Sequence, residues 1–188
     1  MKYFYIHGLM ATGQSSAKEL SRVLSTNVAV LSWDYTKRFE ENFEKLSTIL
    51  EREKDDFILM GSSMGGYYAN ALANKFLVSC ALFNPVTNPQ ELLKKVKNID
   101  FYKNDIEKLT EEVINSYKVQ KDVLLPRVIV IGKNDDIVNP DENIKHWEGR
   151  CFLKVVDEGH KIKNFDILKQ DILDLENPLF YDINEILD

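Results

Sequence analysis

The sequence predicts an α/β protein built on a doubly wound, mostly parallel six-stranded sheet in a single domain spanning residues 1–188. Three observations support this. Short apolar runs alternate with helical patterns almost without interruption, as in repeated β-α units. The runs are continuously apolar, which is typical of strands covered on both faces. No repeat or linker divides the 188 residues, and a hydrophobic content of 44% is enough for one core.

The individual elements follow from these patterns in chain order. The apolar runs predict strands at Lys2–Ile6, Val28–Trp33, Phe57–Met60, Val78–Phe83, Arg127–Ile131 and Cys151–Val156. Helical periodicity predicts helices at about Ser15–Ser25, Phe39–Lys54, Ser63–Phe76, Asp141–Glu148 and Phe165–Leu175. One stretch, from Asn84 to Pro126, contains no strand and holds helical patterns near Pro89–Val96 and Asp105–Tyr117. This insertion, at about residues 86–126, either fills a surface connection or forms a small cap over a site.

Composition and charge exclude several classes of function. A net charge of −6 and a pI near 5.2 leave no excess of basic residues to bind nucleic acid. No pair of histidines has the spacing of metal ligands, so no metal is expected. Cys80 and Cys151 form no C-x-x-C pair and are expected to be free thiols in a reducing compartment. With neither a signal peptide nor a membrane span in the pattern, a cytoplasmic location is expected.

The most informative motif is Gly61-Ser62-Ser63-Met64-Gly65. It stands between an apolar run of strand length and a helical pattern, so it has the form of a nucleophile elbow. In such an elbow a sharp strand-to-helix turn presents the serine hydroxyl, and small neighbouring residues make room for the turn. The motif therefore predicts that Ser63 is a nucleophile.

A serine nucleophile needs a base, and the base needs an orienting acid. The chain has three histidines. His146 lies in an amphipathic helical pattern, where an exposed histidine is the ordinary explanation, whereas His160 follows the last strand and is the predicted base. Asp135 follows the preceding strand and is the predicted acid, favoured over Asp136 because Ile137 and Val138 must pack inward.

An oxyanion hole would complete the site with two backbone donors. The N–H of Met64, directly after the nucleophile, is one candidate. The other is the N–H of Leu9 in the loop after the first strand, with Met10 as the fallback. His7 is expected to brace this loop by hydrogen bonding.

These motifs, together with Asn84-Pro85 and Gly132–Val138, resemble the α/β-hydrolase superfamily in its smallest form. The closest likeness is to bacterial YqiA-type esterases, and it extends from Tyr3 to about Leu175. The resemblance implies the strand order 2-1-3-4-5-6, with the helical insertion between the fourth and fifth strands. It also implies that the protein hydrolyses an ester or thioester without a cofactor. The catalytic residues would be Ser63, Asp135 and His160, which occur in the chain order expected of this superfamily.

Two alternatives from other classes remain. Gly8–Ser15 has the spacing of a phosphate-binding loop after a strand and before a helix, although Gln14 stands where the lysine belongs. The chain could also be a catalytically silent hydrolase fold that binds a ligand, although all three triad residues are present. We expect a serine hydrolase acting on a small or exposed acyl group.

The substrate pocket is less defined by the sequence than the triad. Five large side chains lie near strand ends and could line an apolar acyl pocket, but aromatic residues there belong more often to the core: Trp33, Tyr35, Tyr67, Tyr68 and Met10. A small-molecule ester or thioester is the expected partner.

Overall fold

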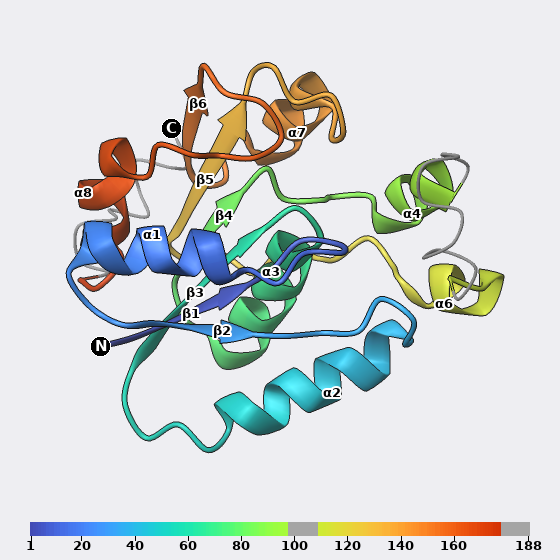
Figure 1. Ribbon diagram of the computed structural model, residues 1–188, viewed down its shortest axis with the longest axis horizontal. Coiled ribbons are helices and arrows are strands. Elements are labelled where there is room, and N and C mark those ends of the chain that lie inside the picture. Colours follow the sequence, from blue (N-terminus) through green and yellow to red (C-terminus); the bar gives the residue numbers. More distant parts are fainter. Residues whose placement is uncertain (98–108, 178–188) are drawn as a thin grey trace.

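The computed structural model describes residues 1–97 and 109–177 (Figure 1). Its centre is a six-stranded sheet in the order β2-β1-β3-β4-β5-β6, and all neighbouring strands are parallel. The predicted strand order is therefore confirmed. The strands are β1 (Lys2–Ile6), β2 (Val28–Leu31), β3 (Phe57–Ser62), β4 (Cys80–Phe83), β5 (Arg127–Gly132) and β6 (Phe152–Val156).

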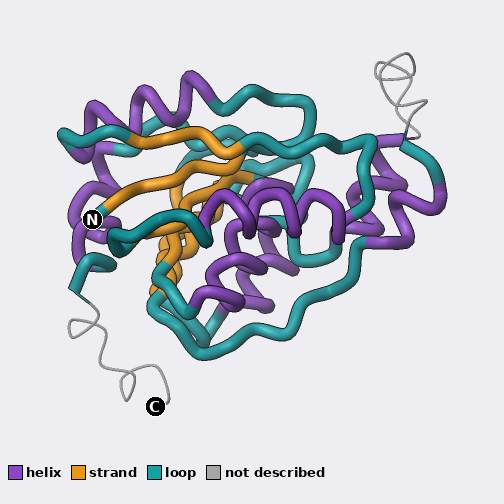
Figure 2. The backbone as a smooth tube through the Cα atoms, turned by 90° about the horizontal axis from the view of Figure 1, so that it is seen from below, coloured by secondary structure: helices purple, strands orange, loops and turns teal. Residues whose placement is uncertain are grey.

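Helices cover both faces of the sheet (Figure 1, Figure 2). One face carries α1 and α8, while α2, α3 and α7 pack with α4 and α6 on the other. The helices are α1 (Gln14–Leu24), α2 (Phe39–Leu50), α3 (Met64–Phe76), α4 (Pro89–Lys97), α6 (Glu111–Ser116), α7 (Pro140–Trp147) and α8 (Lys169–Asp174), with a 3-10 turn, η2 (Asp166–Leu168), before α8. The doubly wound arrangement is as the sequence predicts.

The two-sided cover explains why the strands read as continuous apolar runs. In β1, Tyr3 and Tyr5 enter the core under α1, while Phe4 and Ile6 enter the core under α3. Successive side chains of a strand point to opposite faces, so both sets must be apolar when both faces are buried.

Three predicted strands are shorter in the structure: β6 begins one residue late, at Phe152, and β2 and β4 lose apolar ends that have other roles. Trp33 lies beyond the end of β2, where its buried indole Nε1 donates a hydrogen bond to the carbonyl of His7 at 2.8 Å. Val78 follows the C-terminal end of α3: Leu77 is left-handed (φ 55°), and the N–H of Val78 bonds the carbonyl of Ala73 in the last turn of the helix. Leu77 and the two residues after it connect α3 to β4.

The insertion between β4 and β5 contains the predicted helices α4 and α6. The second was predicted over Asp105–Tyr117; residues 105–108 lie outside the described residues, and the described part is helical from Glu111. That helix begins where Thr110 Oγ1 accepts a hydrogen bond from the N–H of Val113. Within residues 1–97 and 109–177, none of the helices has the length and apolar character needed to span a membrane.

All strands end at the same edge of the sheet, because all are parallel. The three residues of the predicted triad all lie at or just beyond this edge: Ser63 after β3, Asp135 after β5 and His160 after β6. His7 after β1 and Asn84 after β4 lie at the same edge. The carboxyl edge of an open α/β sheet is where ligands bind.

Candidate active site

Ser63 occupies a sharp turn between β3 and α3. Its backbone has φ 53° and ψ −124°, a conformation that a residue with a side chain rarely adopts. Three hydrogen bonds hold it: its N–H donates to the carbonyl of Phe83 at 3.0 Å, and its carbonyl accepts from the N–H groups of Tyr67 and Val86 at 3.2 Å. The strand-turn-helix form predicted for this motif is present.

The glycines of the motif are required by close backbone approach. A Cβ at Gly65 would overlap the carbonyl oxygens of Ile6 and His7, and one at Gly61 would overlap the carbonyl oxygen of Gly65. The first turn of α3 therefore lies directly against the end of β1. Only residues without a side chain fit at these two positions.

Asp135 and His160 form a hydrogen-bonded pair. His160 Nδ1 lies 2.9 Å from both carboxylate oxygens of Asp135, whose side chain is 1% exposed. The N–H groups of Ile137 and Val138 donate to Asp135 Oδ1 at 2.8 and 2.9 Å. A carboxylate can only accept, so we assign the Nδ1 proton to His160, and Nε2 is then free to accept a proton. Asp136, the rival position, is exposed.

Asn84 holds the loop that carries His160. This fully buried side chain donates from Nδ2 to the carbonyls of Gly159 and His160, at 3.0 and 2.9 Å. Its Oδ1 accepts a hydrogen bond from the N–H of Gly132 at 2.7 Å. Asn84 thus joins the ends of β4 and β5 to the histidine loop. In the sequence, Asn84 stands out only as part of the family resemblance, and this role is not predicted from it.

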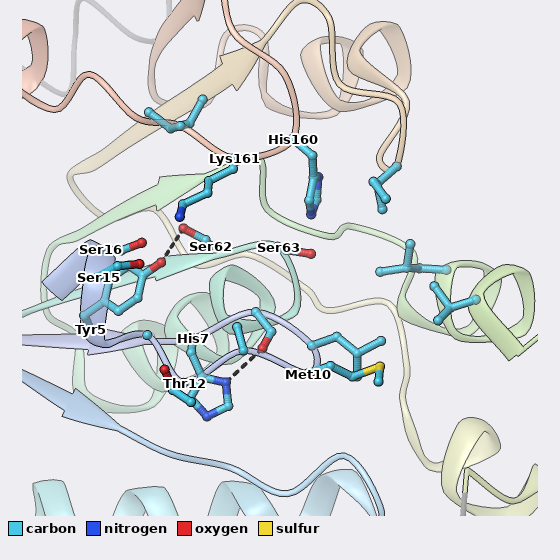
Figure 3. A pocket seen from close by; sticks show the side chains of 18 of the residues that line it. Tyr5, His7, Met10, Thr12, Ser15, Ser16, Ser62, Ser63, His160 and Lys161 are labelled. Carbon is cyan, nitrogen blue, oxygen red and sulfur yellow. Dashed lines mark hydrogen bonds between the residues drawn. The ribbon is translucent and has the colours of Figure 1, made fainter. Parts of the chain in front are cut away.

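Ser63 and His160 line one cavity of about 580 Å³. Figure 3 shows the hydroxyl of Ser63 and the imidazole of His160 facing this cavity from opposite sides. Among the described residues no hydrogen bond joins the two side chains. Catalytic hydrogen bonds are often long before substrate binds, so this spacing does not exclude proton transfer.

The loop after β1 lies beside the elbow. A Cβ added at Gly8 would come within 3.4 Å of Ser63 Cβ, and Leu9 and Met10 line the cavity. Met10 is left-handed (φ 56°), so the chain turns sharply here. Met64, which directly follows Ser63, is fully buried and is not among the residues that line the cavity. Within the described part of the chain, the N–H groups of Leu9 and Met64 have no hydrogen-bond acceptor.

His7 braces this loop, as the sequence predicts. Its Nδ1 donates to the carbonyl of Gly8 at 2.8 Å, and its ring stacks on Trp33 with centroids 6.0 Å apart. Burial lowers the pKa of His7, although the hydrogen bond to Gly8 opposes this. The neutral form of the imidazole is therefore favoured. The contacts of His7 hold the loop in place, which is a structural role.

Ser62, the other hydroxyl of the motif, has a different partner. It is the last residue of β3, and its Oγ accepts a hydrogen bond from the hydroxyl of Tyr5 at 2.7 Å. Both side chains line the cavity.

Most of the large side chains near strand ends lie in the core. Trp33, Tyr67 and Tyr68 are buried, and the hydroxyl of Tyr68 bonds that of Tyr117 at 2.8 Å. Neither they nor Tyr35 lines the cavity, whereas Met10 does. The interpretation of these aromatic residues as core is confirmed.

His146, expected to be an exposed helical histidine, is partly buried instead. Its Nε2 lies 3.2 Å from Asp122 Oδ2, and its side chain is 24% exposed. Asp122 lies in the connection before β5, so the helical pattern around His146 could not reveal this partner. The expectation of simple exposure is wrong because the tertiary fold brings a carboxylate to the helix.

Comparison with known proteins identifies the family. The model of an uncharacterised protein family, UPF0227, matches residues 2–177. The chain belongs to UPF0227. Structure comparison shows that this UPF0227 member has the fold of several solved hydrolases, the fold that the resemblance in the sequence implies.

Three solved structures illustrate the likeness in fold. A pyrethroid hydrolase from Sphingobium faniae JZ-2 has a TM-score of 0.72 at 14% identity, covering 96% of this chain and 99% of its own. Est1E from Butyrivibrio proteoclasticus has a TM-score of 0.70 at 16% identity, covering 93% and 89%. A monoacylglycerol lipase from Paleococcus ferrophilus has a TM-score of 0.65 at 16% identity, covering 92% of each chain.

Proposed function

We propose that this UPF0227 member is a serine hydrolase that cleaves a carboxylic ester or thioester through an acyl-enzyme intermediate. The observation that carries the proposal is the shared cavity: Ser63, on its strained turn, faces the same space as His160, which is bonded to the buried Asp135. The fold, and its likeness to a pyrethroid hydrolase and a monoacylglycerol lipase, support the same reaction class.

The proposed reaction assigns one role to each group. His160 Nε2 takes the proton of Ser63 as its oxygen attacks the carbonyl carbon, and Asp135 stabilises the resulting imidazolium. The N–H groups of Met64 and Leu9 stabilise the oxyanion. The leaving alcohol or thiol takes the proton from His160, and water then releases the acyl group by the same steps.

We further propose that residues 1–188 form one hydrolase domain in which the insertion at about 86–126 acts as a cap. The support is that Leu92, Lys95 and Val96 of α4 line the cavity.

A cytoplasmic location also stays a prediction. The thiols of Cys80 and Cys151 are free, and burial raises the pKa of each to about 12.

The phosphate-binding alternative uses the same space. Part of Gly8–Ser15 lines the cavity, but the position of the phosphate-binding lysine is Gln14, and the overall fold is that of hydrolases. Among the residues that the structure describes, no cluster of three metal-ligating side chains occurs.

A test of the proposal replaces the nucleophile. Ser63→Ala should lower kcat for a short-chain nitrophenyl ester by at least about 10⁴-fold, because the variant lacks the hydroxyl that stands on the strained turn. Ser62→Ala is the matched comparison and should cost less than about tenfold, because its hydroxyl is bonded to Tyr5. Circular dichroism should show both variants folded.

Covalent labelling identifies the residue independently. A fluorophosphonate probe should modify Ser63, as located by peptide mass spectrometry, and the label should be absent from Ser63→Ala. Activity that survives in Ser63→Ala but is lost in Ser62→Ala would mean that the nucleophile is misassigned. A rise of the melting temperature with ATP and no labelling would favour the phosphate-binding alternative.

A further inference from the structure

The cavity around Ser63 has two chemically different halves. Figure 3 shows Tyr5, Ser15, Ser16, Ser62 and Lys161 gathered on one side of Ser63 and His160, and Met10 on the other. The second half continues to apolar side chains from α4 and the loop after β5: Leu92, Val96 and Ile137. The first half is lined by hydroxyl groups and Lys161, and the second is mainly apolar, with Lys95 and Asp136 as its charged residues.

The polar half is lined by hydroxyl groups that can donate hydrogen bonds. Tyr5 is 2% exposed and donates its hydroxyl proton to Ser62 Oγ at 2.7 Å. Ser62 therefore accepts from the core and can donate its own proton into the cavity. Ser15 and Ser16 add two hydroxyls from the first turn of α1, which carries no acidic residue.

Lys161 supplies the positive charge of this half. It directly follows His160, lines the cavity and points toward Ser62 in Figure 3. Within residues 1–97 and 109–177, no carboxylate is paired with its ammonium group. The other cation of the cavity, Lys95, lies on the α4 side and bonds the carbonyls of Asp136 and Ile137 at 3.5 and 3.2 Å. Asp136, an exposed carboxylate that also lines the cavity, lies on the loop after β5, on the same side as Lys95.

We propose that the polar half binds an anionic group, a carboxylate or a phosphate, on the leaving-group side of the substrate, and that Lys161 selects for it. This inference rests on the proposed hydrolase function. The acyl chain and the leaving group extend in opposite directions from the carbonyl carbon on Ser63. An alkyl acyl chain fits the walls formed by Met10, Leu92 and Val96, so the leaving group lies against Ser62 and Lys161.

The test compares esters that differ only in the charge of the leaving group. The probes are 4-butyryloxybenzoate and its neutral methyl ester, with 4-butyryloxyphenyl phosphate as the phosphate form. The quantity measured is the ratio of kcat/KM for the charged and neutral esters. Comparing this ratio between proteins cancels the intrinsic reactivity of each ester.

Lys161→Gln should lower the ratio about fivefold, the effect of one partly exposed ion pair. Raising the salt concentration from about 0.05 to about 0.5 M should lower the ratio in the wild type, because salt screens the pair. The matched control is Lys163→Gln, an exposed lysine of the same loop that does not line the cavity, and it should leave the ratio unchanged. The anion whose ratio falls more in Lys161→Gln, carboxylate or phosphate, is the one that Lys161 prefers.

The outcomes separate this inference from the proposed function. An unchanged ratio in Lys161→Gln, with the neutral ester still cleaved in a Ser63-dependent manner, overturns the anion subsite and leaves the hydrolase intact. If the wild type cleaves none of the three esters and the fluorophosphonate probe does not label Ser63, the proposed function and the subsite both fail.

Discussion

Two histidine–aspartate pairs in this protein look alike but have different surroundings. The side chains of His160 and His146 are 25% and 24% exposed, and each lies within hydrogen-bond distance of a carboxylate. His160 bonds Asp135 through Nδ1, which leaves Nε2 toward a cavity of about 580 Å³ that Ser63 also lines. His146 uses Nε2 for its bond to Asp122.

The surroundings of His146 leave no room for a reaction. Its ring contacts that of Trp147 with centroids 4.7 Å apart, and the adjoining cavity has a volume of about 10 Å³, room for one water molecule at most. Asp122 is also bonded by Asn70 of α3 at 2.6 Å. A His–Asp pair is thus a structural contact by default, and it becomes a candidate catalytic pair only where a nucleophile and a cavity adjoin it.

Matched substitutions of the two carboxylates give the largest expected difference. Asp135→Asn should lower kcat about 10³–10⁴-fold, because an amide no longer holds the Nδ1 proton on His160 in the reactive tautomer. Asp122→Asn should change kcat less than about threefold. Steady-state hydrolysis of a short-chain nitrophenyl ester measures both. Equal losses in the two variants would refute the distinction between the pairs.

Asn84→Asp should have an intermediate effect by moving the histidine loop. The new carboxylate would face the carbonyls of Gly159 and His160, which accept hydrogen bonds and repel it. We expect kcat to fall about 10–100-fold with a much smaller change in KM, as for a positioning residue. The backbone at Asn84 has φ 45°, which aspartate tolerates, so the backbone is not the cause of the loss.

The control for Asn84 is another buried amide. Asn143 is 1% exposed and donates to the carbonyl of Pro85 at 3.0 Å, away from the histidine loop. Asn143→Asp should lower the melting temperature while kcat per folded molecule is retained. A fall in kcat of the same size in both variants would show that Asn84 acts only through stability.

The smallest expected effect is on stability, at the second pair. Burial raises the pKa of Asp122, but hydrogen bonds from His146 and Asn70 and the charge of Arg127 outweigh it, so the pKa is below its ordinary value. A depressed pKa contributes stability above the unfolded value near 4, and this is lost as the pH falls through the folded value. Asp122→Asn should therefore cost about 1 kcal/mol of unfolding free energy at pH 7.

Denaturant unfolding at several pH values checks this. The difference between wild type and Asp122→Asn should shrink below about pH 4, when the wild-type carboxyl becomes protonated. A difference that stays constant from pH 7 to pH 3 would show that the charge of Asp122 is irrelevant and that packing alone is responsible.

Much of the fold follows from local patterns in the sequence. Every predicted strand is present, with ends that differ where Trp33 and Val78 serve loop and helix-end contacts. The elbow was predictable because its glycines are dictated by steric contact within a few residues and with the adjoining strand. The pairing of Asp135 with His160 followed from the rule that parallel strands end at one edge, and the structure places their side chains 2.9 Å apart.

The sequence by itself determined the order of strands and helices and the position of the serine turn, because periodicity and backbone sterics act between near neighbours. Only the tertiary structure decided which polar groups meet. Asn84 reaches carbonyls 75 and 76 residues away, and His146 meets a carboxylate 24 residues away. Lys161 likewise lines the same cavity as Ser15 and Ser62, although the three residues come from separate parts of the fold. Such contacts depend on how the elements dock, because a hydrogen bond requires a separation of about 3 Å that sequence spacing does not specify.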